Sequence, residues 1–438
     1  PNASEFKIRT VITGHGQEGE FVSQNHFLNL NGGATEYTWP VWTECGANPI
    51  YPQGGTWIYD RAGWCPGQAS DLREDDITSL VTPGQVHNID YGVANASGSS
   101  NYWVSSQLVS YSNINHNLDA SLVDIITPTN KVKYSRINPS CGKPKIIIKN
   151  TGSQQINSLT IEYWTNNNSV KETQLWTGAL NFLEEEVIEL NDPASLWENL
   201  LATNNNFHIQ ISEPNQSQDQ YIHNNYLTSK FEPTPVYDNS FAIWLETNSG
   251  SVGVNQSETS WEIHDNNNNL TYQSAGGGSL MINTQYRDTL TFNDGCYSFR
   301  INDSDDDGID FWANSDGAGM ARFRKLGASW IKVFEGDFGS FVHHEFRIEN
   351  NITSNQESFN EWSFYPNPTQ NQITINGYSQ EPTNFILSDS LGKQIKKFTI
   401  DSDGVFSKRI DLSYLNEGVY LLKIINTKEE VVKKLIKL

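Results

Sequence analysis

The chain has 438 residues, which at roughly 150 residues per domain is enough for about three domains. It contains 29 Lys and Arg and 51 Asp and Glu, a net charge of −22, which argues against nucleic acid or an anionic membrane surface as its main partner. Charged residues make up only 18% of the chain and aromatic residues 12%, a composition closer to extracellular β-proteins and carbohydrate binders than to cytosolic helical enzymes. No apolar run is long enough for a membrane-spanning helix.

The start of the chain and its cysteines indicate processing and an oxidising compartment. The chain begins at Pro1 with no initiator Met and no basic or apolar leader, so we expect it to be processed or trimmed. Cys45 and Cys65 enclose a short loop rich in Trp and Gly, where a disulfide would contribute about 3 kcal/mol. Cys141 and Cys296 fall in different segments, and the sequence is compatible with either a second disulfide or two buried thiols.

Alternation of apolar and polar residues with a period of two dominates the chain. It is clear at residues 7–12, 159–164 and 288–292, and turn residues recur between such runs. This pattern predicts an all-β chain built from antiparallel β-sandwiches. The best helix candidate is residues 193–201, with Asp192 as a possible N-cap before Pro193.

Asn- and Ser-rich stretches divide the chain into segments. We predict a partial jelly roll, an immunoglobulin-like sandwich that resembles adhesion modules of secreted bacterial proteins, a CUB-like sandwich, a polar linker and a small C-terminal sandwich. From Ser363 onward there are 10 basic and 8 acidic residues, a net charge of +2, whereas the first 362 residues carry −24. The C-terminal segment is therefore predicted to be a separate module. The predicted boundaries are 1–114, 115–232, 233–352, 353–360 and 361–438.

Several short motifs follow one another in the C-terminal segment. A Pro-Asn-Pro entry stiffens the chain before a strand, two glycines provide turns, and the last strand alternates apolar residues with Lys. The motifs are residues 364–368, 372–375, 387–393, 415–423 and 432–438. In this order they resemble the type A sorting domain of the Bacteroidota type IX secretion system. The resemblance implies export through the periplasm and an outer-membrane translocon, contact with its shuttle or attachment proteins, and a secreted or cell-surface protein.

Two stretches near the start carry the strongest functional signal. Residues 9–16 read as a strand that ends in a Gly-rich loop, and residues 45–67 read as a Cys-clamped loop with an Asp-Arg pair and two Trp. Flat rings stack on sugar faces and charged groups bind hydroxyls or amides, so such a loop is a plausible sugar-recognition surface. Together the stretches, above all the octet at 60–67, resemble the second jelly roll of peptide-N-glycosidase F, an amidase family that removes N-linked glycans.

The resemblance implies hydrolysis of the bond between N-acetylglucosamine and Asn of an N-glycoprotein, without a catalytic cofactor. Glu20 matches an acid of the active site, Arg61 the arginine that orients the catalytic carboxylate, and Trp64 an aromatic residue at the sugar site. His15 and Asp60 are further candidates for substrate binding. The primary catalytic Asp of the family lies in the first jelly roll, which we expect upstream of this chain, because the matched domain begins several strands before residue 9.

Some positions depart from the family pattern. Glu18 and Val22 stand where the family has cysteines, and His15, Gln17 and Phe21 replace Trp, His and Trp. Two structural alternatives therefore stay open: Glu20 as an exposed acid in a loop, and Asp60 with Arg61 as an ion pair that only supports the disulfide loop. A different function also stays open, a non-catalytic surface adhesin or glycan-binding protein carried as secretion cargo.

An acidic turn in the third segment has Asp at alternate positions followed by Gly. This pattern wraps oxygen atoms around Ca²⁺, and Asp303, Asp305, Asp307 and Asp310 are the candidate ligands. The twelfth position is Asn314 rather than Glu, so the turn is not an EF-hand. The alternatives are a structural Ca²⁺ site and a solvated acidic turn.

Overall fold

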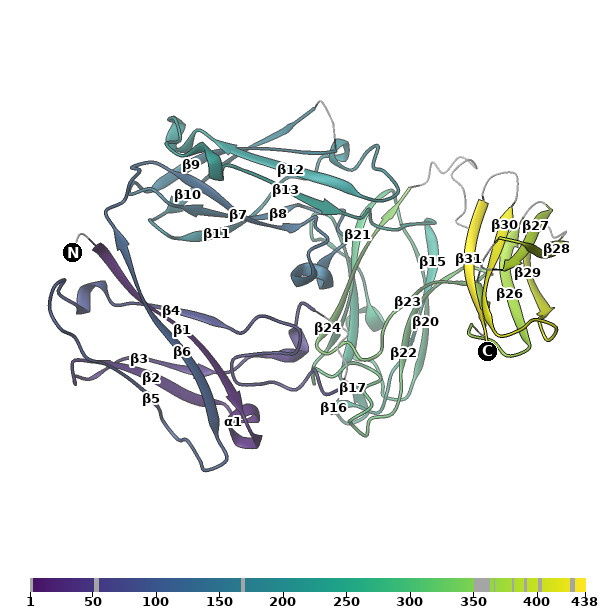
Figure 1. Ribbon diagram of the computed structural model, residues 1–438, viewed down its shortest axis with the longest axis horizontal. Coiled ribbons are helices and arrows are strands. Elements are labelled where there is room, and N and C mark those ends of the chain that lie inside the picture. Colours follow the sequence, from purple (N-terminus) through teal and green to yellow (C-terminus); the bar gives the residue numbers. More distant parts are fainter. Residues whose placement is uncertain are drawn as a thin grey trace. The chain divides into compact units, whose positions relative to one another are not determined.

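The computed structural model describes residues 3–50, 55–166, 170–349, 363–365, 367–379, 382–389, 392–400, 404–425 and 430–438. The chain forms two compact units, Pro1–Asn350 and Asn351–Leu438 (Figure 1). The predicted linker at 353–360 lies outside the described residues, as do Pro366, Ser390 and Leu391 of the C-terminal motifs. Strands dominate every part, which confirms the all-β prediction, while the boundaries at 114 and 232 stay predictions.

The first part of unit 1 holds two three-stranded sheets. Alternate residues of the long strand β1 point inward, so that Ile8 and Ile12 pack against Leu28 and Trp39 of the other sheet. A short helix, α1 (Gln17–Phe21), follows β1, and two 3₁₀ turns occupy Cys45–Ala47 and Thr78–Leu80. One sheet has the order β4 (Leu72–Asp76), β1 (Ala3–His15), β6 (Asn101–Ser112), and the other β3 (Thr35–Val41), β2 (Gln24–Leu30), β5 (Ile89–Val93).

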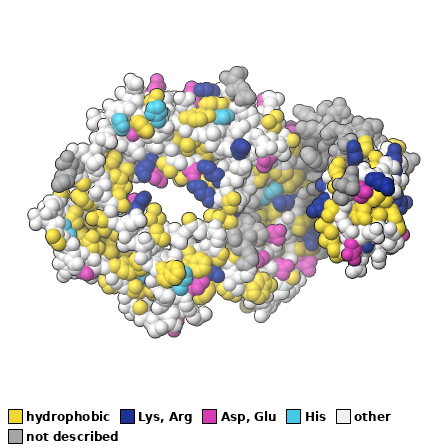
Figure 2. All heavy atoms as spheres, in the orientation of Figure 1, with side chains coloured by type: hydrophobic (Ala, Val, Ile, Leu, Met, Phe, Trp, Pro, Cys, Tyr) yellow, Lys and Arg dark blue, Asp and Glu magenta, His cyan; other side chains and the backbone are white. Residues whose placement is uncertain are grey.

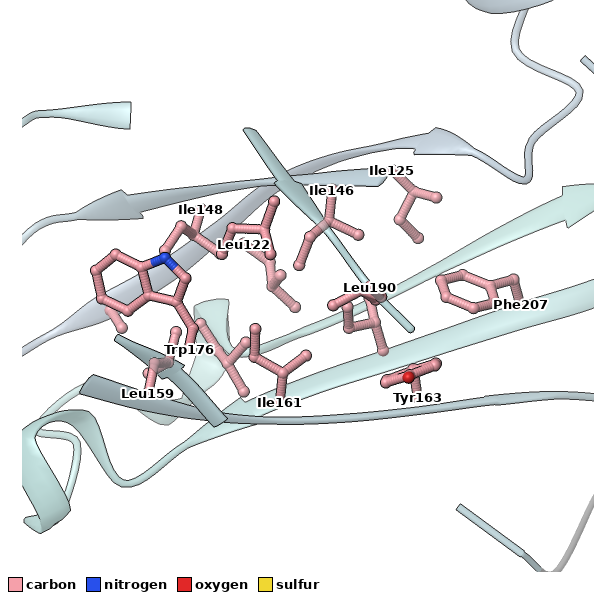
Figure 3. Packing of buried hydrophobic residues seen from close by; sticks show 14 of the residues in the cluster. Leu122, Ile125, Ile146, Ile148, Leu159, Ile161, Tyr163, Trp176, Leu190 and Phe207 are labelled. Atoms are coloured by element: carbon pink, nitrogen blue, oxygen red, sulfur yellow. The ribbon is translucent and has the colours of Figure 1, made fainter. Parts of the chain in front are cut away.

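The middle part of unit 1 is a two-sheet sandwich. Ile146 and Ile148 of β8 face Leu159 and Ile161 of β9 in its interior (Figure 3). One sheet has the order β11 (Glu185–Glu189), β8 (Lys145–Asn150), β7 (Ala120–Thr127), and the other β10 (Glu172–Leu180), β9 (Ile156–Thr165), β12 (Asn205–Ser212), β13 (Tyr226–Phe231). Further 3₁₀ turns lie at Val132–Ile137, Ala194–Leu196, Pro214–Gln216 and Ile222–Asn224.

The helix predicted at 193–201 is wrong. Only a 3₁₀ turn forms at Ala194–Leu196, and Pro193 precedes it with extended backbone and no side-chain cap from Asp192. Leu196 and Trp197, adjacent in sequence, are both buried in the sandwich core. Two consecutive buried residues fit a turn inserted into a core better than one face of a surface helix.

The third part of unit 1 is a second sandwich with an aromatic core that includes Phe241, Phe299, Phe323 and Phe346. One sheet has the order β14 (Val236–Tyr237), β24 (Phe341–Ile348), β21 (Gly295–Asp303), β18 (Thr259–Asp265), β19 (Leu270–Gln273). The other has the order β20 (Gln285–Thr291), β15 (Ser240–Glu246), β22 (Met320–Lys325), β23 (Trp330–Val333). A small hairpin joins β16 (Ser251–Gly253) to β17 (Gln256–Ser257), and a 3₁₀ turn lies at Ser274–Gly277.

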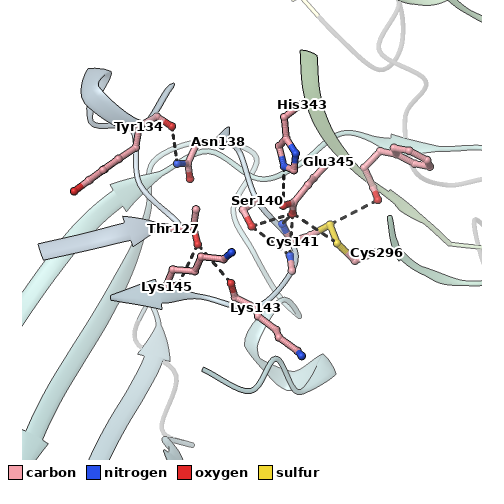
Figure 4. Close-up of polar contacts among 12 residues, drawn as sticks. Thr127, Tyr134, Asn138, Ser140, Cys141, Lys143, Lys145, Cys296, His343 and Glu345 are labelled. Carbon is pink, nitrogen blue, oxygen red and sulfur yellow. Dashed lines mark hydrogen bonds and ion pairs between the residues drawn. A yellow bond between two sulfur atoms is a disulfide. The ribbon is translucent and has the colours of Figure 1, made fainter. Parts of the chain in front are cut away.

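A disulfide joins Cys141, before β8, to Cys296 of β21, which decides between the two alternatives left open by the sequence. Beside it, Glu345 accepts hydrogen bonds from Ser140 Oγ at 2.9 Å, Cys141 N at 2.8 Å and His343 Nε2 at 3.2 Å (Figure 4). Burial by itself would raise the pKa of Glu345, but these donors hold it below its usual value. The middle and third parts are thus joined covalently and by a hydrogen-bonded carboxylate.

Unit 2 is a small sandwich around Ile373, Phe385, Leu422 and Leu435. One sheet has the order β25 (Ser363–Tyr365), β26 (Gln372–Ser379), β29 (Gly404–Asp411), and the other β28 (Gln394–Ile400), β27 (Thr383–Asp389), β30 (Gly418–Ile425), β31 (Glu430–Lys437). Several Lys and Arg side chains lie on its visible face (Figure 2). Among the described residues of the whole chain, none of the helices has the length and apolarity needed to cross a membrane.

Candidate active site

The end of β1 and helix α1 place Glu20. A Cβ atom at Gly14 would lie 1.9 Å from the carbonyl oxygen of Gly19, so only glycine lets α1 pack directly on the strand. Glu20 N donates to Gly16 O at 2.8 Å, and Ala62 N donates to Glu20 O at 2.9 Å. Glu20 therefore lies in a helix that is tied to the loop between Cys45 and Cys65, and not in an exposed loop.

The disulfide between Cys45 and Cys65 closes that second loop, as its spacing predicts. Within the loop, Thr43 and Arg61 exchange backbone hydrogen bonds of 2.8 and 3.1 Å. These two backbone hydrogen bonds hold Arg61 where its side chain reaches α1. Arg61 is only 4% exposed, which is unusual for arginine and requires that its donors be satisfied by nearby acceptors.

The guanidinium of Arg61 is held on several sides. It donates to the carbonyl oxygens of Tyr59 at 2.5 Å and Thr56 at 2.8 Å, and its Nε donates to Glu20 Oε1 at 3.0 Å. The carbonyls fix the plane of the guanidinium, which in turn fixes one carboxylate oxygen of Glu20. Among the described residues, no hydrogen bond occupies Glu20 Oε2, and the side chain is 19% exposed. That oxygen is available to hold a water molecule or an amide.

The Asp-Arg pair of the sequence is not the ion pair of the structure. Arg61 pairs with Glu20, whereas Asp60 Oδ1 accepts a hydrogen bond from Cys45 N at 2.9 Å. Burial raises the pKa of Asp60, opposed by the hydrogen bond from Cys45 N. The two neighbouring side chains thus have different partners, and Asp60 faces a pocket.

An aromatic group lies beside the Glu20–Arg61 pair. The Trp64 ring is 5.3 Å from the Arg61 guanidinium, and Trp64 Nε1 donates to Gly14 O at 3.1 Å. The His15 ring is 6.0 Å from Trp64 and 5.0 Å from Trp103, whose side chain is 69% exposed. We call Trp64, His15 and Trp103 the aromatic platform. Trp103 is exposed whereas His15 and Trp64 are half-buried, and an exposed flat ring suits the apolar face of a sugar.

Asp60 lines a pocket with a cavity volume of about 590 Å³. Its lining combines residues of α1 and the disulfide loop with the acidic turn of the third part. Glu20, Arg61, Trp64 and His15 are not part of its lining. The lining residues are Gln17, Phe21, Trp42, Ile58, Tyr59, Asp60, Asp305, Asp306, Asp307, Asn314 and Asp316.

The third part of unit 1 packs directly on the disulfide loop. Trp57 is fully buried there, beside Ile58 and Phe311, and its Nε1 donates to Asp337 Oδ1 at 2.9 Å. Burial raises the pKa of Asp337 to about 6 in spite of this hydrogen bond. The third part therefore forms a wall of the candidate site and is not a separate accessory domain.

The predicted calcium ligands are only partly brought together. Asp303 and Asp307 are buried and lie beside Glu258, whereas Asp305 and Asp310 are exposed and lie outside this group. Glu258 was missed because it is far from the turn in sequence. The antiparallel register pairs its neighbour Thr259 with Asp303, and only this register brings the three carboxyls together.

Trp103 was also missed as a site residue. It lies opposite Thr13 in the register between β6 and β1, two residues from His15. The alternation of apolar and polar residues around Trp103 indicates only that it lies in a strand. The pairing of β6 with β1 is what places it next to His15.

Comparison with known proteins supports both family resemblances. Residues 1–109 match the family model described as "Peptide-N-glycosidase F, C terminal", and residues 363–438 match the one described as "Secretion system C-terminal sorting domain". The curated protein "Peptide-N(4)-(N-acetyl-beta-D-glucosaminyl)asparagine amidase F" of Elizabethkingia miricola is 30% identical over 128 residues, covering 26% of this chain and 36% of the relative. The chain thus spans about a third of that relative's length.

Solved structures give weaker similarity. The BSP domain of a biofilm associated protein is 10% identical, with a TM-score of 0.17 over 99% of this chain and 90% of that one. The FN1–FN3 domains of chicken CNTN1 are 8% identical, with a TM-score of 0.14 over 72% of this chain and 98% of that one. Neither carries a functional argument.

The two family matches confirm the resemblances predicted from the sequence at both ends of the chain. The sorting domain indicates export by type IX secretion, so the protein is secreted or lies at the cell surface. The chain therefore combines an N-terminal segment similar to the C-terminal part of peptide-N-glycosidase F with a C-terminal sorting domain of a secreted protein.

Proposed function

We propose that the protein is a secreted amidase that hydrolyses the bond between N-acetylglucosamine and Asn in N-glycoproteins. The observation that carries this proposal is the buried Arg61, which three loop carbonyls and Glu20 hold in one orientation beside the aromatic platform. A carboxylate fixed through one oxygen and accessible through the other suits the positioning of water or of a substrate amide.

The proposed reaction adds water to the carbonyl carbon of the glycosylated Asn side chain. The carbon–nitrogen bond then breaks, the nitrogen leaves with the sugar as a glycosylamine after taking up a proton, and Asp remains in the peptide. The resemblance assigns activation of the water to an Asp of the first jelly roll, which lies outside the matched C-terminal domain. Glu20 Oε2 would hold the water or the amide, and Arg61 would position Glu20. These groups need no cofactor.

Substrate binding is proposed to use two surfaces, the aromatic platform and the pocket that contains Asp60. The aromatic platform would stack on sugar faces, and Asp60 in the pocket would accept hydrogen bonds from hydroxyls or amides. Because the acidic turn also lines the pocket, the third part would contribute to substrate selection. Residues 361–438 would engage the type IX translocon and its shuttle or attachment proteins.

A second candidate, a non-catalytic glycan-binding protein or adhesin, is favoured by one observation. The aromatic platform presents an exposed Trp103 beside half-buried His15 and Trp64, while Glu18 and Val22 stand where the family has a pair of cysteines. A protein that kept the platform but lost the chemistry would still bind glycans.

One experiment separates the two candidates. The native secreted protein that contains residues 1–438 is incubated with a denatured N-glycoprotein, and the products are analysed by mass spectrometry. The amidase proposal predicts free glycan together with conversion of glycosylated Asn to Asp. Glycan binding without any conversion would contradict it and favour the adhesin.

A further inference from the structure

Three buried carboxyl groups meet at the edge of the third part of unit 1. Glu258, Asp303 and Asp307 each place a carboxylate oxygen within 4.8 Å of the others. Asp303 ends β21 beside Thr259 of β18, so the register brings Glu258 to the turn. The turn from Asp303 to Asp307 then brings the carboxyl of Asp307 close to the other two. All three residues are less than 10% exposed, at 7%, 4% and 7%.

Two of the oxygen atoms in this cluster have no hydrogen-bond donor. Asp303 Oδ1 accepts from the backbone N–H groups of Asp305 and Asp307 at 3.2 and 3.3 Å, but the buried Oδ2 accepts none. Asp307 Oδ2 accepts from Asn314 Nδ2, but the buried Oδ1 accepts none. Buried carboxylate oxygens are normally satisfied, because leaving one without a partner costs much of its solvation.

The neighbourhood adds negative charge to the cluster. The charges of Asp305 and Asp316 act on both Glu258 and Asp307. Burial, with the charges of Glu258 and Asp307, raises the pKa of Asp303 to about 8. Burial, with neighbouring Asp charges, raises the pKa of Glu258 to about 7 and of Asp307 to about 6. The arrangement is thus unfavourable for three ionised carboxyls alone, and a bound cation would remove both the repulsion and the unsatisfied oxygens.

We infer that Glu258, Asp303 and Asp307 bind one Ca²⁺ ion, with water and nearby oxygen atoms completing its coordination. The donors are all oxygens, the atoms that Ca²⁺ prefers, and no His or Cys belongs to the group. Ca²⁺ accepts an irregular set of about six to eight oxygen ligands, whereas Mg²⁺ requires a near-octahedral set and keeps more water. Asp310, which the sequence pattern includes, is exposed and does not belong to the site.

The ion would fix a wall of the candidate active site. Asp305, Asp306 and Asp307 line the pocket that also contains Asp60, and a Cβ atom at Gly46 would lie 2.8 Å from Asp306 Cβ. The turn is therefore held between the proposed ion on one side and the disulfide loop on the other. The Ca²⁺ site itself does not depend on the proposed amidase activity.

The test measures bound metal and thermal stability in the full chain. The protein is treated with EDTA, exchanged into chelator-free buffer and titrated with CaCl₂ or MgCl₂, and bound metal is measured by equilibrium dialysis and mass spectrometry. We expect the wild-type chain to bind Ca²⁺ and to show a Tm that rises by several degrees with Ca²⁺, because binding to the folded state alone stabilises it. Absence of bound Ca²⁺, or an equal Tm rise with Mg²⁺ at the same concentration, would overturn the assignment.

Matched variants locate the ion. Asp303→Asn and Glu258→Gln keep the shape of the side chain and are expected to bind one Ca²⁺ fewer per chain and to lose the Tm rise. Asp310→Asn, in the same turn but outside the cluster, is expected to behave as wild type. If Asp303→Asn does not fold, Glu258→Gln answers the same question. Equal loss of Ca²⁺ in Asp310→Asn, or full binding by Glu258→Gln, would contradict the proposed ligand set.

Discussion

Arg136 offers a direct way to perturb the wall of the candidate site without touching its residues. It lies in the 3₁₀ turn between β7 and β8 and is only 3% exposed. Its guanidinium donates to Gly46 O at 2.8 Å and Asn48 O at 2.7 Å in the disulfide loop, and to Phe338 O at 2.6 Å in the third part. One side chain thus connects all three parts of unit 1.

We predict that Arg136→Met lowers the free energy of unfolding of this region by about 4 kcal/mol. Met retains much of the packing of the stem but donates no hydrogen bond. Each buried carbonyl that loses its donor costs about 1–3 kcal/mol, and Gly46 O retains one donor, the backbone N–H of Ser340 at 2.9 Å. Asn48 O and Phe338 O then lose this donor, which gives a loss of about 2–6 kcal/mol with a midpoint of about 4 kcal/mol.

The assay is hydrogen exchange of the amides around Ser340 and Asn48, combined with denaturant unfolding followed by Trp fluorescence. Lys131→Met is the matched control, because Lys131 flanks the same turn but is 43% exposed and pairs with Asp124. Because Lys131 is exposed and the buried Asp124 keeps Lys133 and Tyr134 as partners, we expect Lys131→Met to cost at most about 1 kcal/mol. Equal effects of the two substitutions, or a loss below about 1 kcal/mol in Arg136→Met, would refute the account of the interface.

Two further predictions concern stability. Replacing Cys45 and Cys65 together by Ser opens a loop with a sequence separation of 20 and is expected to cost about 3 kcal/mol, measured by denaturant unfolding; a change below about 1 kcal/mol would show that packing alone holds the loop. Burial lowers the pKa of His26 from 6.5 to about 4, so the unfolded chain binds a proton that the folded chain does not in this pH range. His26 therefore removes up to about 1.4 kcal/mol of stability per pH unit as the pH falls from 6.5 towards 4, and His26→Gln should flatten that dependence. Parallel pH dependences of the two proteins would contradict the neutral, buried state of His26.

Local patterns predicted the strands, but not which strands pair. Period-two alternation is a property of neighbouring residues, so segments such as β1 and β9 were found from the sequence. The register that joins Glu258 to Asp303, and Trp103 to the platform, depends on contacts between distant residues. The Cys141–Cys296 disulfide, with a sequence separation of 155, was undecided for the same reason.

Sequence proximity was misleading in two places. Asp60 and Arg61 are neighbours in sequence but have different partners, since Asp60 accepts from Cys45 N and Arg61 reaches Glu20 on a helix 41 residues away. Asp192 and Pro193 form a typical helix start. However, Leu196 and Trp197 are both buried in the sandwich core, and the chain forms only a 3₁₀ turn there. In both cases packing between distant segments outweighed a local preference.

Glu20, held by Arg61, is expected to take part in glycan release. The most direct test compares initial rates of glycan release by the native protein and by the Glu20→Gln and Glu18→Gln variants. Both glutamates lie on α1, but only Glu20 pairs with Arg61, whereas Glu18 is exposed. We predict a loss of at least about 100-fold for Glu20→Gln, in the range typical of a positioned acid–base group, and a wild-type rate for Glu18→Gln. Equal rates in all three proteins would contradict it.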